Sequence, residues 1–193
     1  MRRKTFDKIV TFVGFGLAVF LLIAAGLLNW GATFAQGTVK SQLEAQQITI
    51  PADNGDPKAD AATKKFFADN GDKLMTTGKQ AQMYADHYIG FHLSAMPTYA
   101  EASGIARSAT SAAAADPANA DAQAAASKAN ATVETVFKGE TLRGMLLNAY
   151  AFGTLGEIAA IAALVSLVGG ILLLLLSIAG LMHIRRTPED ATI

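Results

Sequence analysis

The sequence predicts an all-α membrane protein in which two transmembrane helices form a hairpin, with an extracytoplasmic helical domain between them. Two runs, residues 9–28 and 158–182, contain no charged residue. Basic residues flank the outer end of each run, and apolar residues in the polar chain between the runs have the spacing of helices. The mean hydropathy of +0.29 agrees with two apolar spans around a polar middle.

The second run is the stronger membrane signal. Its 25 residues would extend about 37 Å as a helix, more than the roughly 30 Å hydrocarbon core of a bilayer. Only Ser166 and Ser177 interrupt its apolar and small residues, so it lacks the polar face of a helix in a soluble domain. We expect this run to cross the membrane.

The first run, of 20 residues, is long enough to cross once. A cleaved signal peptide is the alternative, because residues 33–35 (Thr-Phe-Ala) loosely resemble a cleavage site. The apolar run is longer than the 7 to 15 residues that are usual in signal peptides, which favours an uncut anchor.

The charges at the two ends predict the orientation. Arg2, Arg3, Lys4 and Lys8 precede the first run, and basic residues at 185 and 186 follow the second, so the positive-inside rule places both termini in the cytoplasm. The predicted segments are a cytoplasmic basic tail (1–8), transmembrane helix 1 (9–28), the extracytoplasmic domain (29–157), transmembrane helix 2 (158–182) and a cytoplasmic tail (183–193). We expect four aromatic residues to lie in one interfacial layer: Trp30, Phe34, Tyr150 and Phe152.

The extracytoplasmic part reads as a series of helices. The first span is expected to continue through residues 37–47 and to break before Pro51. Further helices are predicted at 58–67, 77–96, 99–114 and 131–156, and the alanine-rich stretch 108–130 reads either as two modest helices meeting at Asp116-Pro117 or as a mobile hairpin.

Composition excludes several kinds of chemistry. The chain has no cysteine, which excludes disulfides, thiolate catalysis, zinc–thiolate sites, iron–sulfur clusters and covalent c-type haem. Residues 33–157 hold ten Lys or Arg and thirteen Asp or Glu, a balance that argues against a nucleic-acid partner. The absence of charge inside the spans argues against a pump or an ion transporter. No cofactor is expected.

The sequence contains two candidate metal sites, and each has a simpler structural interpretation. Asp53, Asp56, Asp69 and Asp72 sit in two copies of Ala-Asp-Asn-Gly-Asp, but neither copy has the spacing of an EF-hand, and Asn-Gly favours turns. Met83 and His87 have a helical spacing that could serve copper, but residues so spaced more often pack. We predict no metal site.

Small residues recur every four positions in both spans, at Gly14 and Ala18 and at Ala162, Ser166 and Gly170. Such ridges allow helices to approach closely. We expect these residues to pack the two spans together, to dock the protein onto a larger membrane complex, or to do both. In the central domain, the candidate partner surface comprises Tyr84, Tyr88, His92, Glu140 and Arg143. The spacing of Glu140 and Arg143, three residues apart on the predicted helix 131–156, predicts an ion pair on its surface.

Residues 84–93 (YADHYIGFHL) and 139–159 (GETLRGMLLNAYAFGTLGEIA) resemble a family of actinobacterial membrane proteins with two spans and an exported helical middle. Members are often labelled automatically as aromatic ring-opening dioxygenase subunits. The chain lacks the set of His and carboxylate ligands that non-haem iron requires, so the resemblance implies the architecture and no reaction. By analogy with small accessory proteins of actinobacterial respiratory supercomplexes, it also implies a role as such a subunit.

Three functional hypotheses follow. The first is a noncatalytic accessory or scaffolding subunit of a membrane complex, with the respiratory chain supercomplex as a candidate partner and a homo-oligomer as another arrangement. The second is an extracytoplasmic sensor or carrier that binds a lipid or a small apolar ligand. The third is an enzyme that uses Asp86, His87 and Tyr84 or Tyr88 for acid–base chemistry.

Overall fold

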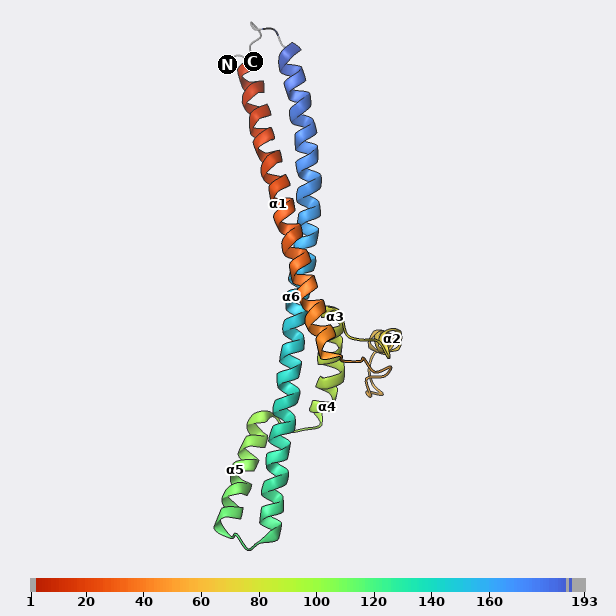
Figure 1. Ribbon diagram of the computed structural model, residues 1–193, viewed down its shortest axis with the longest axis vertical. Coiled ribbons are helices and arrows are strands. Elements are labelled where there is room, and N and C mark those ends of the chain that lie inside the picture. The colour runs from red at the N-terminus through yellow and green to blue at the C-terminus, as the bar shows by residue number, and fades with distance from the viewer. Residues whose placement is uncertain (1–2, 187, 189–193) are drawn as a thin grey trace. The chain divides into compact units, whose positions relative to one another are not determined.

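The computed structural model describes residues 3–186 and 188 (Figure 1). Within these residues every regular element is a helix, and the one β-type pairing is an isolated bridge between Thr49 and Leu74. The elements are α1 (Arg3–Gln46), α2 (Ala61–Asn70), α3 (Gly78–Met83), the π-helix η1 (Tyr84–Ile89), α4 (Gly90–Ser94), α5 (Tyr99–Ala115) and α6 (Ala120–Arg186). The all-helical prediction is confirmed. Arg2 and most of the predicted C-terminal tail (187 and 189–193) lie outside the described residues.

The chain divides into two compact units. Residues 1–37 and 154–193 form one, which we call the apolar unit, and residues 38–153 form the other, the central unit. Both α1 and α6 contribute residues to each unit. The central unit is shorter than the predicted domain 29–157, because the start of that range and its last four residues belong to the apolar unit.

The apolar unit contains two helices that are long and apolar enough to cross a membrane. In the most apolar 18-residue window of α1, 17% of the residues are buried within the chain, and in that of α6 the share is 11%. A core helix of a soluble protein would be mostly buried. These helices instead expose apolar side chains on most of their circumference.

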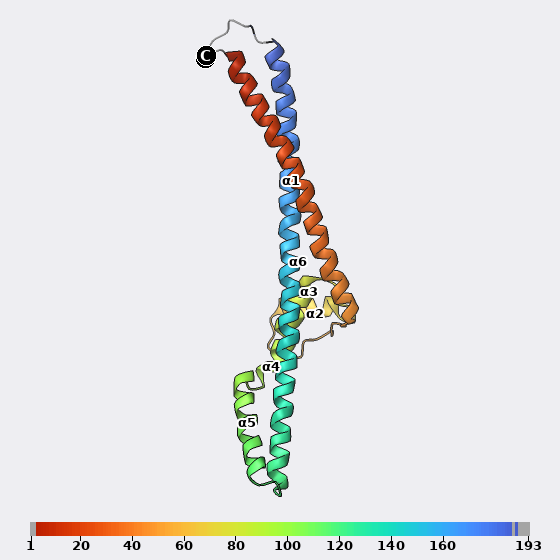
Figure 2. The same ribbon diagram turned by 60° about the vertical axis from the view of Figure 1, so that its left-hand side comes forward.

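The two helices of the apolar unit pack antiparallel along a narrow seam (Figures 1 and 2). A Cβ atom at Gly170 would lie 3.0 Å from Leu22 Cδ2 and 3.3 Å from Ala18 O, and one at Gly14 would lie 2.9 Å from Ser177 Oγ. The buried residues recur every seven positions: Thr11, Ala18, Ala25 and Ala32 on α1, and Gly156, Ala163, Gly170, Ser177 and Ile184 on α6. This is the repeat of a left-handed pair of helices.

The seam differs from the predicted ridge of small residues four positions apart. Ala18 and Gly170 lie in the seam, whereas Ala162 and Ser166 are only half-buried and the buried neighbour is Ala163. Steps of four residues advance about 40° around a helix with 3.6 residues per turn, whereas steps of seven drift by only about 20°. Residues seven positions apart therefore stay on the side that faces the partner helix over more turns than residues four positions apart.

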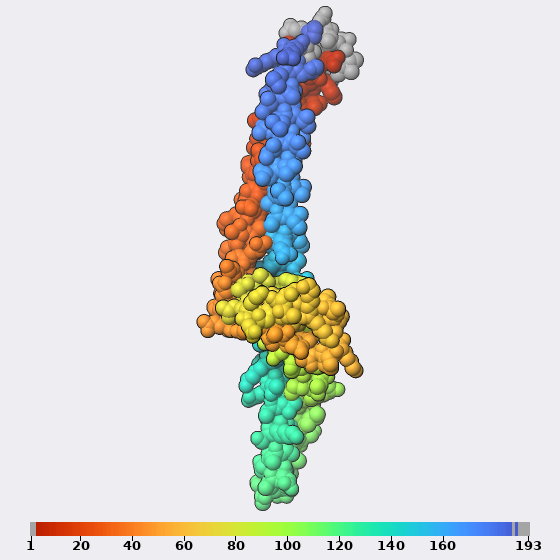
Figure 3. Space-filling view, turned by 90° about the vertical axis from the view of Figure 1, so that its right-hand side faces the viewer, coloured from red at the N-terminus to blue at the C-terminus, as the bar shows by residue number. Residues whose placement is uncertain are grey.

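The central unit has a core of its own, built from segments that are distant in sequence. Its buried residues are Val39, Leu43, Ile50, Phe67, Met75, Ala81, Ala85, Ile89 and Leu146. Phe67, Ile50 and Met75 have no exposed surface. Figure 3 shows the segment that supplies most of these residues, in gold and yellow, as a compact body.

The short helix α2 starts later than the predicted range of 58–67. Asp60 is its N-cap and accepts hydrogen bonds from the backbone N–H of Ala62 and Thr63, at 2.8 and 2.9 Å. The hydrogen bonds from the backbone and hydroxyl of Thr63, with that from Ala62, lower the pKa of the Asp60 carboxyl. The helix then reaches Asn70 and buries Phe67.

The alanine-rich stretch forms a helical hairpin. The helix α5 ends at Ala115 and α6 begins at Ala120, so the turn lies at the predicted Asp116-Pro117. Buried alanines on both helices allow close approach, and Asn130 Nδ2 donates to Thr110 Oγ1 over 3.3 Å. From Ala120 onward α6 is one helix of 67 residues, which joins the second helix of the alanine-rich stretch, the predicted helix 131–156 and the second span without a break.

Replacing Gly170 by leucine is expected to destabilise the pairing of α1 and α6 by about 1–3 kcal/mol, because the new side chain overpacks the contact with Leu22 and Ala18. Gly16→Leu is the matched control, since a Cβ atom there meets nothing within 4 Å. Thermal unfolding of the two variants in mild detergent measures the difference. Equal melting temperatures would contradict the seam.

Candidate functional site

The candidate site lies on the continuous helical segment 78–94, formed by α3, η1 and α4, and on the part of α6 that it contacts within the central unit. Glycines allow the two to approach. A Cβ atom at Gly78 would lie 3.0 Å from Ala149 O, and one at Gly139 would lie 2.8 Å from Leu93 Cδ2. A side chain at Gly78 would press on the backbone of α6, and one at Gly139 would displace the Leu93 side chain.

The middle of this segment, residues 84–89, forms a π-helix that the sequence did not predict. The N–H of Gly90 donates to the carbonyl oxygen of Ala85, five residues earlier. π-Helical turns are rare in proteins, and those that occur often lie at functional sites. Thr77 begins the segment with a capping box: its hydroxyl accepts from the N–H of Gln80, whose side chain accepts in return from the N–H of Thr77.

A buried amide ties the π-helix to the loop after Pro51. Asn54 is 1% exposed, and its Nδ2 donates to the carbonyl oxygen of His87 over 3.1 Å. Its Oδ1 accepts from the N–H of Asp56 at 3.3 Å. A buried amide without these partners would cost free energy, so the loop and the π-helix hold each other in place.

An ion-pair cluster joins the π-helix to α6. Arg143 Nη2 lies 3.3 Å from Asp86 Oδ1, and its Nη1 lies 3.6 Å from Glu140 Oε2. The three side chains are 36%, 32% and 50% exposed, so each pair contributes modestly. The sequence predicted the pair of Glu140 and Arg143 but missed Asp86, because 57 residues separate it from Arg143.

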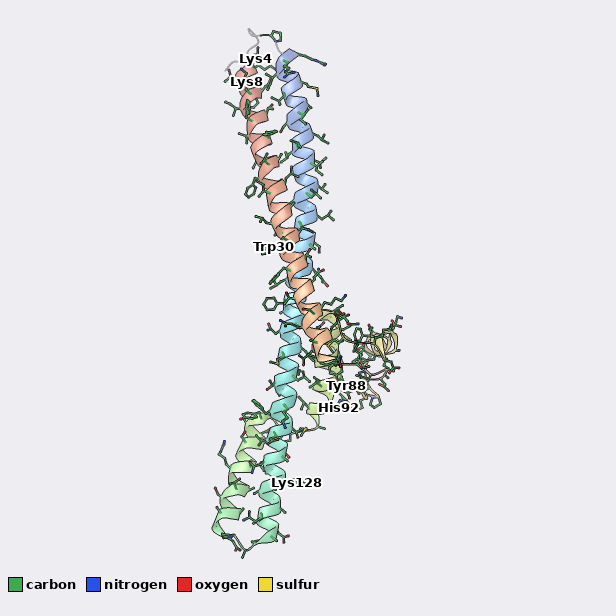
Figure 4. The ribbon with its side chains drawn as sticks, viewed as in Figure 1. Lys4, Lys8, Trp30, Tyr88, His92 and Lys128 are labelled. Carbon is green, nitrogen blue, oxygen red and sulfur yellow. The ribbon has the colours of Figure 1, made fainter. Side chains whose placement is uncertain are left out.

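Three rings form a continuous aromatic row on the same segment, and Figure 4 labels two of them, Tyr88 and His92. The ring centroids of Tyr84 and Tyr88 are 4.8 Å apart, and those of Tyr88 and His92 are 4.5 Å apart. Burial, with a further contribution from Tyr88, raises the pKa of the Tyr84 phenol. Tyr84 and Tyr88 are half-buried and His92 is exposed, so the row keeps surface that another molecule could contact.

The five predicted surface residues thus fall into two groups. Tyr84, Tyr88 and His92 form the aromatic row, and its His92 end lies against the loop, where a Cβ atom at Gly55 would be 3.6 Å from His92 Cε1. Glu140 and Arg143 belong to the ion-pair cluster instead. A groove of about 420 Å³ lies beside that cluster and includes all three of its charged residues.

The other predicted positions are also placed. Trp30 and Phe34 stack in the apolar unit with centroids 5.9 Å apart and are largely exposed. Tyr150 is half-buried and Phe152 is exposed, both in the central unit. The shared interfacial layer of these four aromatics stays a prediction.

Three of the four aspartates of the calcium hypothesis make other interactions. Asp53 and Asp56 accept backbone hydrogen bonds from Gly55 and Lys58, and Asp69 pairs with Lys65 at 2.8 Å. Among residues 3–186 and 188, no group of three or more His, Cys, Asp or Glu side chains gathers where an ion could be held.

Replacing Arg143 by glutamine is expected to destabilise the contact between the π-helix and α6 by about 0.5–1.5 kcal/mol, because Asp86 and Glu140 lose their shared cation. Hydrogen exchange of the amides in η1 and α4 measures this as faster opening. Lys138→Gln is the control, since it removes a largely exposed pair with Glu134 on the same helix. Equal amide exchange rates in the two variants would contradict a stabilising role of the ion-pair cluster.

Comparison of the whole chain with protein-family models, curated proteins and solved structures finds no match, so the resemblance to the actinobacterial two-span family stays a prediction.

Proposed function

We propose that this chain is a noncatalytic accessory subunit of a membrane protein complex. One observation carries the proposal: α1 and α6 pair through one residue in seven and leave most of their apolar circumference uncovered. Apolar surface of this extent is unfavourable in water and is stable against lipid or against other membrane helices. The protein therefore has apolar faces available for a partner after its own two helices have paired.

The exposed faces are wide and lack charge. Between residues 161 and 176 of α6, large side chains such as Leu164, Val165 and Leu176 are each more than 60% exposed. Helices in lipid associate through close packing of such surfaces, because lipid supplies no hydrophobic drive for pairing. A membrane partner would gain contact with these faces without disturbing the seam.

The proposal includes an orientation. Both termini are cytoplasmic and the central unit is extracytoplasmic, in agreement with the basic residues before position 9 and at positions 185 and 186. In this orientation the cysteine-free central unit depends on packing alone in the exported compartment, and its closed apolar core around Phe67 suits that requirement.

In the central unit, the aromatic row is the surface that best suits a protein partner. Tyr84, Tyr88 and His92 offer rigid rings with polar edges, a combination that is enriched in protein interfaces. The respiratory chain supercomplex is the partner that the family resemblance favours. A second copy of this chain is the other arrangement that the same surfaces could serve.

The second hypothesis, a carrier of a lipid or an apolar ligand, requires an apolar pocket in the central unit. The groove beside Arg143 is lined more by polar than by apolar surface. A second groove of about 420 Å³, between α5 and α6, includes Ser103, Thr110, Ser111 and Asn130. This second groove exposes more apolar than polar surface, but it is open to solvent and also includes Arg107, whereas such a ligand requires an enclosed apolar pocket.

The orientation predicts that a cytoplasmic reporter is active when fused to either end of the chain. A periplasmic-type reporter inserted into the exposed turn at residues 116–119 should be active instead, because that turn belongs to the central unit. The three fusions, assayed in intact cells, measure this. Activity of the carboxyl-terminal fusion outside the membrane would overturn the two-span orientation.

The subunit role predicts that the protein, tagged at native expression and extracted in mild detergent, elutes with a larger membrane complex. Tryptophan substitutions at the exposed positions between residues 161 and 176 locate the contact with the partner. Positions that lose the partner should recur on one face with a period near 3.6 residues, whereas positions that face lipid should tolerate tryptophan.

The unfolding temperature of each tryptophan variant is the internal control, since exposed positions should leave the seam intact. A lone monomer at native expression would count against the subunit role. Elution with only copies of itself would identify a homo-oligomer and overturn the accessory role.

A further inference from the structure

We propose that the basic end of the apolar unit holds an anionic phospholipid, with its phosphate between Arg3 and Arg186 and part of an acyl chain in the adjoining groove. This inference rests on the proposed membrane insertion and goes beyond it, because it assigns a ligand class to particular residues. Its basis is the juxtaposition of an apolar groove and unpaired cations at one end of two paired helices.

The groove lies between α1 and α6 next to the seam and has a volume of about 490 Å³, within the range of roughly 300–1,000 Å³ that is usual for ligand sites. Phe6 and Val10 line it on α1, and Leu173 and Leu176 line it on α6. The lining is more apolar than that of either groove of the central unit. It therefore fits a hydrocarbon chain better than a polar solute.

Cations lie on the same faces as the groove. Arg3 precedes Phe6 by three residues and Asp7 by four, and Arg186 follows His183 by three. Residues so spaced share one face of a helix, so each arginine lies about one turn beyond the last groove-lining residues of its helix. Neither arginine has a hydrogen bond or an ion pair within the described part of the chain. Lys4 and Lys8 also lie at this end (Figure 4).

The charge of this end is complementary to a phosphate. Residues 1–8 and 183–193 hold six Lys or Arg and three Asp or Glu. The acid that lines the groove is Asp7, whose Oδ2 lies 3.8 Å from His183 Nε2, so a histidine accompanies that carboxylate. Basic pockets between membrane helices on the cytoplasmic side are suited to anionic lipid headgroups. The predicted orientation places this end on that side.

A lipid fits this end better than a free phosphate or an acidic protein. The groove and the cations form one continuous site with an apolar part and a charged part, as a phospholipid has. A free phosphate would leave the apolar part unused, and an acidic protein segment would have to enter the membrane core. The common ligand that combines both parts is an anionic phospholipid.

The test uses contact quenching of a tryptophan in the groove by brominated lipid. Leu176→Trp places the reporter at the exposed rim of the groove, and Trp30→Phe removes the native tryptophan. The full chain is reconstituted in phosphatidylcholine with a minor fraction of either brominated phosphatidylglycerol or brominated phosphatidylcholine. We expect a preference of roughly 25-fold for phosphatidylglycerol near the reporter, since each of the two arginines contributes about fivefold.

Two double variants separate a site from a general surface charge. In the reporter background, Arg3→Gln with Arg186→Gln should abolish the preference. Lys8→Gln with Arg185→Gln removes the same amount of charge at the same end, but from positions that do not share the face of the groove. This second double variant should retain the preference for phosphatidylglycerol. Ala179→Phe fills the groove without changing charge and should also abolish the preference.

The outcomes are distinct. Equal quenching by the two lipids, equal loss of the preference in the two double variants, or full preference in the Ala179→Phe variant would each overturn the site while leaving membrane insertion intact. If neither brominated lipid quenched the reporter, membrane insertion itself would fail, and the site with it.

Discussion

The close approach of α1 and α6 in the apolar unit is the constraint on which the rest of the interpretation depends. The buried residues that recur every seven positions along the seam are small, except Ile184 at its end. A Cβ atom at Gly170 would lie only 3.0 Å from the Leu22 side chain. Small residues let backbones approach and gain van der Waals contact, which is the main attraction between helices in lipid. The narrow seam leaves the other faces of both helices uncovered.

The central unit follows a different principle. It buries large apolar side chains such as Phe67 and Met75 in a compact core, and it attaches the segment 78–94 to α6 at glycines. Asn54 and the Asp86–Arg143 pair add polar contacts at the π-helix. Because no disulfide is available, these contacts and the core must together supply the stability of the unit.

The two units offer two kinds of surface, and both suit binding to other molecules. The apolar unit presents uncharged faces and, at one end, a groove beside Arg3 and Arg186. The central unit presents the row of Tyr84, Tyr88 and His92. An accessory subunit that meets lipid with one unit and a protein with the other would use all of these features.

The sequence by itself determined the features that depend on neighbouring residues. The uncharged runs 9–28 and 158–182 predicted two apolar helices, Asp116-Pro117 predicted the turn between α5 and α6, and the spacing of Glu140 and Arg143 predicted their pairing. Periodicity and local backbone preferences act over a few residues, so they can be read from a single sequence.

Only the tertiary structure decided which distant residues meet. The seven-residue seam, the hydrogen bond from Asn54 to His87 and the pairing of Asp86 with Arg143 join segments that no local pattern connects. The π-helix likewise has no signature in the residues that form it. Each depends on how two packed segments are aligned with one another, and that alignment minimises the free energy of the assembled helices rather than of any single one.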